Sequence, residues 1–124
     1  HMKRLYNSIA TIRGKEVNAT HLLTGENLGQ VSSQTLGNLG GVEITTSLLP
    51  LRPLLAFDKV AIMTMARNIG TLEISEGPEV CDALGPSKPT TVANKEWLER
   101  SEDRAGGLQH LASDSYSKLR IVKL

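Results

Sequence analysis

Residues 23–36 read Leu-Thr-Gly-Glu-Asn-Leu-Gly-Gln-Val-Ser-Ser-Gln-Thr-Leu, and the organisation of the chain can be worked out from them. The apolar run of residues 21–23 predicts a buried strand, and Val31 to Leu39 predicts a short helix ended by Gly40-Gly41. Ligands of open α/β sheets bind at such loops, where helix N-terminal amides favour an anion or a polar base. Because the spacing is neither GxGxxG nor a Walker sequence, an ordinary strand-to-helix turn is the alternative.

The flanking segments predict further regular structure. From Lys3 to about Thr20, apolar residues recur at helical spacing. The apolar run from Thr45 to Leu55 contains two prolines, which confine it to a sheet edge or to irregular extended chain. Between Asp58 as N-cap and Gly70 as left-handed C-cap, a single apolar face predicts a helix.

The remaining segments complete the expected order of elements. Leu72-Glu73-Ile74 predicts a strand. A polar helix is expected from Val92 to Arg104, capped by Thr90 or Thr91, and Leu119 to Leu124 is a possible last strand. Strands and helices in this alternation predict an α/β fold with a parallel sheet.

Composition limits the functions that the chain can perform. Its 124 residues carry a formal net charge of +1 and 3% aromatic residues, which provides neither a strong basic field nor a stacking platform for nucleic acid. No apolar run is long enough to predict a membrane span. Residues 1–2 read as a tag remnant, no secretory signal is expected, and the single Cys81 cannot form an internal disulfide. A cytoplasmic location is therefore predicted.

The segment of residues 23–36 closely resembles the signature of the tRNA 4-thiouridine and thiamine-pathway sulfurtransferase family. Further likenesses follow in family order, at Leu51-Arg52-Pro53-Leu54, Asp58-Lys59, Ala66-Arg67-Asn68-Ile69-Gly70-Thr71, Pro78-Glu79-Val80-Cys81 and Ser87-Lys88-Pro89-Thr90. The resemblance implies that residues 3–91 are the C-terminal half of a PP-loop ATP-pyrophosphatase domain of the adenine-nucleotide α-hydrolase type. Its fold would be a partial Rossmann-like parallel sheet with flanking helices, and residues 92–124 would form a helical tail with a possible final strand.

The same resemblance implies a reaction and a cofactor. Family members adenylate a uridine near the 5′ end of tRNA with ATP, and a persulfide then displaces AMP. Lys3, Gly25 and Gln34 fall on nucleotide-contacting positions of the family. The backbone at Gly25 would lie against the adenosine, Gln34 would hydrogen-bond it, and Lys3 would direct its charge towards phosphate.

Cys81 has two interpretations. From the residues alone, a single cysteine is more often a small buried apolar side chain, and Glu79 and Asp82 beside it disfavour the thiolate. The family pattern Pro-Glu-x-Cys, followed by Ser-Lys-Pro, implies instead that Cys81 is the catalytic cysteine, which accepts or resolves the relayed sulfur.

Other polar residues carry weaker predictions. Arg52, set between two prolines, is able to pair with a carboxylate or with phosphate. Asp58-Lys59 is more simply a helix cap with a surface ion pair, and His21 is more simply a structural histidine. One cysteine and scattered histidines provide no metal-ligand spacing, so no metal site is expected.

The sequence has no counterpart of the phosphate-gripping loop of the family, Ser-Gly-Gly-x-Asp-Ser. Nor does it contain the family's N-terminal tRNA-binding module or rhodanese domain. We therefore expect half of an active site, inactive alone, with Mg-ATP held through the missing half. A half sheet of this kind would also expose an apolar edge and apolar faces.

Two functions stay open at this point. One is a partial tRNA sulfurtransferase, for 4-thiouridine formation or for the thiamine thiazole, that meets tRNA and a sulfur-donor protein through the full enzyme. Three explanations of the missing half stay open: a separate partner chain contains the PP-loop, a homo-oligomer covers the open sheet edge, or the sequence is an excised domain or a degenerate copy that keeps the fold without the activity. The other is a non-catalytic self-associating or regulatory module derived from the same domain.

Overall fold

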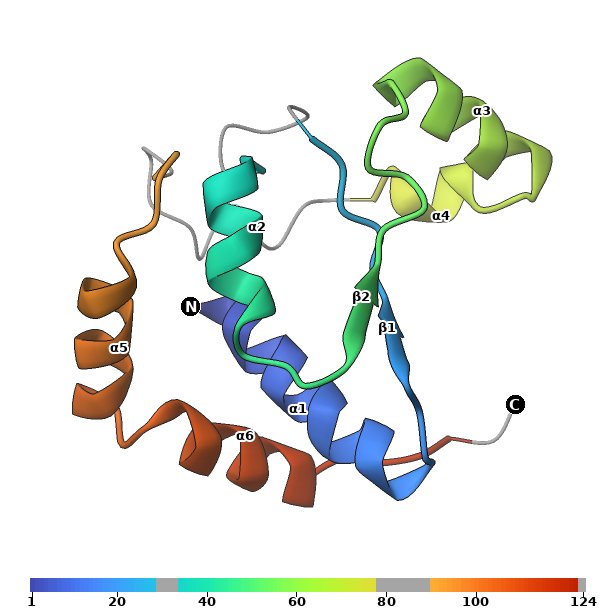
Figure 1. Cartoon of the computed structure of the whole chain (residues 1–124). Helices are drawn as coiled ribbons and strands as arrows, with labels where there is room; N and C mark the ends of the chain where they lie inside the picture. Colours follow the sequence, from blue (N-terminus) through green and yellow to red (C-terminus); the bar gives the residue numbers. More distant parts are fainter. Residues whose placement is uncertain (29–33, 78–89, 123–124) are drawn as a thin grey trace.

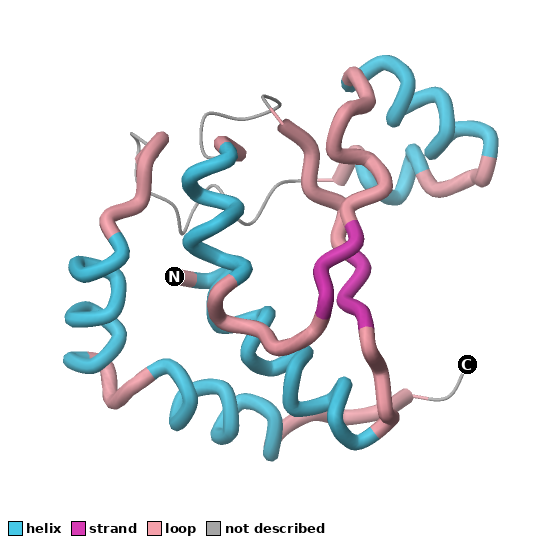
Figure 2. Tube along the Cα trace, in the orientation of Figure 1, coloured by secondary structure: helices cyan, strands magenta, loops and turns pink. Residues whose placement is uncertain are grey.

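A β–α–β unit forms the centre of the chain in the computed structural model, which describes residues 1–28, 34–77 and 90–122 (Figure 1). The strands β1 (His21–Leu23) and β2 (Leu49–Leu51) are parallel, with His21 opposite Leu49, and α2 (Leu36–Glu43) connects them (Figure 2). The predicted α/β fold with a parallel sheet is confirmed. In the described part of the chain, the sheet has two strands.

The helix α1 (Met2–Glu16) packs against α2, β1 and α6 (Leu108–Ser117). Gly14 allows a close approach, because a Cβ at this position would lie 2.7 Å from Cδ1 of Leu48. The buried apolar side chains of the described residues are few: Leu39, Leu48, Leu98 and Ala112. The core is therefore small, and polar contacts contribute much to the joining of the elements.

One buried guanidinium joins α1, α2 and α5 (Lys95–Arg104). Arg4 Nε donates to Glu102 Oε1 at 2.7 Å, and Arg4 Nη2 donates to Glu102 Oε2 at 2.9 Å. Arg4 Nη1 donates to the carbonyl oxygen of Gly41 at 2.6 Å. A bidentate pair of this kind is among the strongest polar contacts in proteins, and it fixes the three helices relative to one another.

The helix α2 differs from the prediction at its end. It begins at Leu36, where Thr35 Oγ1 accepts from the N–H of Asn38 at 3.2 Å. It continues through Gly40-Gly41, so the predicted stop at these glycines is wrong. Burial of Leu39 and the hydrogen bond to the Gly41 carbonyl oppose the helix cost of about 1 kcal/mol per glycine. The predicted start at Val31 lies outside the described residues.

The predicted strand at residues 72–74 is also wrong. The helix α3 (Lys59–Asn68) begins at its Asp58 cap, and Gly70 follows it with a φ of +74°, both as predicted. The next residues form a helical turn, α4 (Leu72–Ser75), in which Ser75 Oγ donates to the carbonyl of Thr71 at 2.8 Å. An apolar run of three residues does not separate a strand from a turn of helix by its periodicity.

The cap of α5 is Asn94, whose side chain accepts from the N–H of Trp97 at 2.9 Å. The predicted cap at Thr90 or Thr91 is therefore wrong. These two threonines instead offer their carbonyl oxygens to α2 and its cap, and Thr35 Oγ1 donates to that of Thr91 at 2.6 Å. The segment before α5 thus closes over the start of α2.

The helix α6 was not predicted. Gly106 and Gly107, with φ of +101° and +89°, turn the chain back so that α6 lies along α1 with Ala112 fully buried. Residues 119–122 form no strand, contrary to the prediction. A strand needs a hydrogen-bonding neighbour, whereas the N–H of Leu119 bonds back to the Tyr116 carbonyl at the end of α6.

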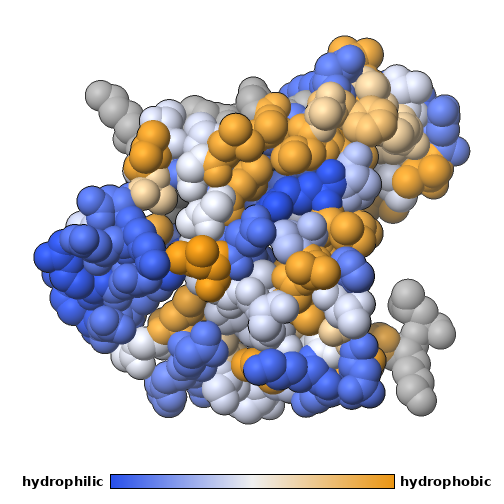
Figure 3. Space-filling model, in the orientation of Figure 1, coloured by the Kyte–Doolittle hydropathy of each residue, from blue (hydrophilic) through white to orange (hydrophobic). Residues whose placement is uncertain are grey.

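One face of the sheet is uncovered. Leu23, Leu49 and Leu51 project from the same face of the paired strands, and all three are exposed. The helices α3 and α4 stand apart from the other helices (Figure 1). Figure 3 shows further apolar surface in this region, and Val60, Ile69 and Ile74 of the segment are exposed. Parallel sheets are normally covered on both faces, so this surface is unusual for a complete domain. Of the helices in the described residues, none is long and apolar enough to cross a membrane.

Candidate functional site

Two loops meet at the carboxyl ends of β1 and β2. The N–H of Thr24 donates to the Leu51 carbonyl at 2.9 Å, and the N–H of Leu28 donates to the Leu55 carbonyl at 3.0 Å. The loop of residues 24–28 therefore runs beside the chain that leaves β2. This edge is where an open parallel sheet binds ligands.

The buried side chain of Asn27 joins the two loops. It is 4% exposed, and its Nδ2 donates to the carbonyl oxygens of Leu54, at 2.7 Å, and of Phe57. Its backbone N–H donates to Oε1 of Gln34 at 2.8 Å. One residue thus connects the loop after β1, the chain after β2 and the approach to α2.

Glu26 is the centre of a charged cluster on the same loop. Its Oε2 accepts from Arg52 Nε at 2.8 Å and from Thr24 Oγ1 at 3.2 Å, and its Oε1 accepts from Lys3 Nζ at 3.3 Å. Arg52 Nη1 also donates to Glu43 Oε2 at 3.2 Å. The cluster joins the start of α1, the end of α2 and both loops.

The surroundings of Glu26 set its charge. Burial raises the pKa of Glu26, but the hydrogen bonds and positive charges of Arg52 and Lys3 outweigh this effect and hold the pKa below its ordinary range. Burial lowers the pKa of Arg52, but its hydrogen bonds and ion pairs with Glu26 and Glu43 outweigh this effect. The pKa of Arg52 is therefore raised above its ordinary value. Glu26 is therefore a carboxylate at neutral pH, and it neutralises part of the charge of Lys3 and Arg52.

The structure brings three of the predicted site residues to one loop. Lys3 contacts Glu26, Gly25 lies next to Glu26 in the chain, and Gln34 contacts Asn27. A Cβ added at Gly25 would meet no atom of the described chain within 4 Å, so this glycine faces open space. Cys81, the predicted catalytic residue, lies outside the described residues.

The weaker predictions have mixed outcomes. Arg52 pairs with carboxylates, which was one of its two predicted partners. Asp58 caps α3, accepting from the N–H of Ala61 at 2.8 Å. His21 is exposed, and its Nδ1 lies 2.7 Å from Oγ1 of Thr20. In residues 1–28, 34–77 and 90–122, no group of three or more His, Cys, Asp or Glu is placed to hold a metal ion.

Sequence reasoning missed Glu26 and Asn27. Both lie between Thr24 and Leu28, where Gly, Glu and Asn read as turn formers. The available signal was that Asn27 is an amide in the loop that follows β1, where its side chain is able to satisfy loop carbonyls. The partners of Asn27 lie 27 and 30 residues further on, so its burial could not be predicted locally.

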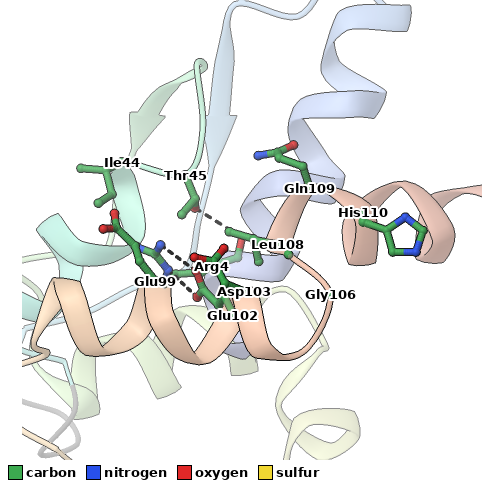
Figure 4. Close-up of a pocket in the computed structure, with 11 residues that line it drawn as sticks. Arg4, Ile44, Thr45, Glu99, Glu102, Asp103, Gly106, Leu108, Gln109 and His110 are labelled. Atoms are coloured by element: carbon green, nitrogen blue, oxygen red, sulfur yellow. Dashed lines mark hydrogen bonds and ion pairs between the residues drawn. The ribbon is translucent and has the colours of Figure 1, made fainter.

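A separate pocket of about 500 Å³ lies between the start of α1, the end of α2, α5 and α6 (Figure 4). Arg4 and Glu102, bound to each other, form part of its wall, and Glu99 and Asp103 of α5 lie near them. None of the residues predicted to contact nucleotide lines this pocket. The loops after β1 and β2 therefore remain the candidate site.

The fold is that of a fragment of a Rossmann-like α/β domain, and the ends of β1 and β2 form its candidate ligand-binding edge. A family model described as "Thiamine biosynthesis protein (ThiI)" matches residues 1–106. This match spans most of the chain, and the chain belongs to that family. The resemblance found in the sequence is thereby confirmed.

Named relatives agree with this assignment. The chain is 43% identical over 104 residues to a tRNA sulfurtransferase of Psychromonas ingrahamii, which covers 83% of the chain and 21% of the relative. It is 38% identical over 105 residues to a probable tRNA sulfurtransferase of Coxiella burnetii, covering 83% of the chain and 26% of the relative. The chain thus spans about a quarter or less of the length of these relatives.

A solved structure resembles the whole fold. It is a 4-thiouridine synthetase–RNA complex with bound ATP, with a TM-score of 0.81 and 37% sequence identity. The match covers 94% of this chain and 31% of that protein.

Proposed function

We propose that this chain is part of an ATP-dependent tRNA sulfurtransferase and forms the adenosine side of its adenylation site. The observation that carries the proposal is the loop pair, around which Lys3, Gly25 and Gln34 gather. The names of the relatives and the ATP bound to the similar structure support it. In the proposed reaction a uridine oxygen attacks the α-phosphate of ATP and releases pyrophosphate, and a persulfide then displaces AMP.

Each of the three residues has a role that its surroundings favour. The Lys3 side chain is 47% exposed, and its bond to Glu26 is long, so Lys3 is able to turn towards a phosphate. Gly25 leaves space that a side chain would fill, which suits a nucleotide lying against the backbone. Gln34 offers an amide from the segment leading into α2.

Cys81 and the tail complete the proposal. In keeping with its place in the family pattern, the Cys81 thiol accepts the terminal sulfur of a donor persulfide and releases the donor thiol, or it attacks the disulfide left after AMP is displaced, which releases 4-thiouridine and forms a disulfide between Cys81 and the donor. Residues 3–91 belong to the PP-loop domain, and residues 92–124 form its helical tail. The product is 4-thiouridine in tRNA, sulfur for the thiamine thiazole, or both, and the reaction takes place in the cytoplasm.

The phosphate side of the site lies on another part of the assembly. The chain spans a small share of its relatives, and the exposed leucines Leu23, Leu49 and Leu51 provide a surface for more of the domain. A homo-oligomer would cover this surface, whereas a partner that carries the Ser-Gly-Gly-x-Asp-Ser loop would cover it and also supply the grip on Mg-ATP. Through that assembly the chain meets tRNA and the sulfur donor.

The test combines binding with turnover. Calorimetric titration should detect weak ATP binding by the chain alone and tighter binding when a protein with the Ser-Gly-Gly-x-Asp-Ser loop is present. The Cys81→Ser variant should bind ATP normally and lose thiolation of tRNA. Absence of nucleotide binding in both titrations, together with unchanged thiolation by Cys81→Ser, would overturn the proposal.

The exposed apolar surface also favours a second candidate, a self-associating module without catalysis. Such a module would form stable oligomers with the sheet face buried, and it would bind no nucleotide in either titration. Light scattering after size-exclusion chromatography distinguishes the two. A monomer that binds ATP excludes the module, whereas an oligomer that does not bind ATP supports it.

A further inference from the structure

The side-chain amide of Asn27 has one possible orientation. It faces the carbonyl oxygens of Leu54, at 2.7 Å, and of Phe57, and carbonyl oxygens only accept hydrogen bonds. Each carbonyl oxygen must therefore accept a hydrogen bond from Nδ2. Together the two bonds use both N–H groups of this amide. With 4% of its surface exposed, Asn27 has little room to leave this position.

The amide of Gln34 is oriented by the same residue. The backbone N–H of Asn27 lies 2.8 Å from the Gln34 amide and can only donate. The Gln34 atom that faces it is therefore the oxygen, and Nε2 points away from Asn27. No acceptor in the described part of the chain takes a hydrogen bond from Nε2.

We propose that Asn27 is a positioning residue of the nucleotide site and that Gln34 acts there as a hydrogen-bond donor. The two side-chain hydrogen bonds of Asn27 hold the loop in place. Its backbone N–H binds the oxygen of the Gln34 amide, which leaves Nε2 of Gln34 to bind a ligand. The ligand group that matches Nε2 is an acceptor atom of the adenosine, either a ring nitrogen of the base or a ribose oxygen. This inference rests on the proposed function, since it assumes that the ligand is an adenine nucleotide.

The variant that separates donor from acceptor is Gln34→Glu. It keeps an oxygen for the Asn27 N–H and loses the donor, so we expect adenosine and ATP affinities to fall about tenfold with no loss of thermal stability. Adenosine is the control for the added negative charge, because it carries no phosphate. A loss confined to ATP, or no loss at all, would overturn the role of Gln34 as a donor.

A double-mutant cycle tests the positioning role of Asn27. Asn27→Ala removes the two side-chain bonds and leaves the backbone N–H in place. If Asn27 acts through Gln34, the adenosine affinity of the Asn27→Ala, Gln34→Glu double variant should be close to that of the weaker single variant. Losses that simply add would show that Asn27 has a structural role only.

A spectroscopic signal keeps the test independent of folding. In the wild-type chain, the side-chain NH₂ resonances of Gln34 should shift on addition of adenosine and those of Asn27 should not. An unchanged Gln34 signal, with adenosine bound, would overturn the inference and leave the proposed function intact. A wild-type chain that binds neither adenosine nor ATP, even with the phosphate-loop partner, would overturn both.

Discussion

At the scale of single residues, the candidate site is held by groups whose partners are far away in the sequence. Lys3, Gly25 and Gln34 were assigned by resemblance, and the structure places all three around one loop. Glu26 and Asn27 were not predicted, because their bonds to the chain after β2 join residues that are far apart in the sequence. Long-range polar pairs leave no local pattern in a sequence.

Glu26 should make stability depend on acid pH. Its pKa is depressed in the folded state, so the stabilisation is present above the ordinary glutamate range and is lost as pH falls through the folded pKa. Thermal unfolding of the wild type and of Glu26→Gln should therefore converge as the pH falls below the ordinary glutamate range and through the depressed pKa of Glu26. Glu43→Gln, which removes the more exposed partner of Arg52, is the control and should change less. A constant difference between wild type and Glu26→Gln would contradict this account.

The Arg4–Glu102 pair allows a second prediction. Both side chains are buried, so Glu102→Ala leaves an uncompensated guanidinium and should lower the free energy of unfolding by about 3–5 kcal/mol. The matched control is Glu99→Ala on the same helix, where an exposed pair with Lys95 is removed and a change of about 0.5 kcal/mol is expected. Urea unfolding measures both, and equal effects would show that the buried pair does not fasten α5.

At the scale of elements, the sequence predicted those with a strong local signal. The helices α1 and α3 and the strand β1 have clear periodicity, caps or flanking turns, and they are found near the expected residues. The errors fall where packing decides the outcome. The helix α2 runs through Gly40-Gly41 because its far end is bonded to Arg4. Residues 72–74 belong to a helical turn in which the N–H of Ser75 donates to the carbonyl of Thr71.

Two glycines test this interpretation of the helices. Gly40 lies inside α2 with no atom within 4 Å of an added Cβ, so Gly40→Ala should stabilise the chain by about 0.5–1 kcal/mol. Gly70 also has open space, but its φ is +74°, so Gly70→Ala should destabilise by about 1 kcal/mol. Thermal melts of both variants provide the comparison. Shifts of the same sign would contradict the assigned conformations.

At the scale of the whole molecule, the chain has a small core and exposes Leu23, Leu49 and Leu51 on its sheet. The sequence predicted this exposure from the absence of the phosphate loop, although it predicted more strands than the described residues form. It could not predict α6, which covers α1 at a site determined by the Gly106-Gly107 turn. The central claim is that the surface beside Gly25 receives the adenosine of ATP.

The most direct test is an ATP titration of wild type and Gly25→Val, each with a partner that carries the Ser-Gly-Gly-x-Asp-Ser loop. The chain leaves space around residue 25, so the valine should leave the thermal stability nearly unchanged. It would occupy the surface meant for the nucleotide. We expect saturable binding by the wild type and at least a tenfold weaker affinity for Gly25→Val, a loss of about 1.4 kcal/mol or more. Equal affinities of the two proteins for ATP would contradict the claim.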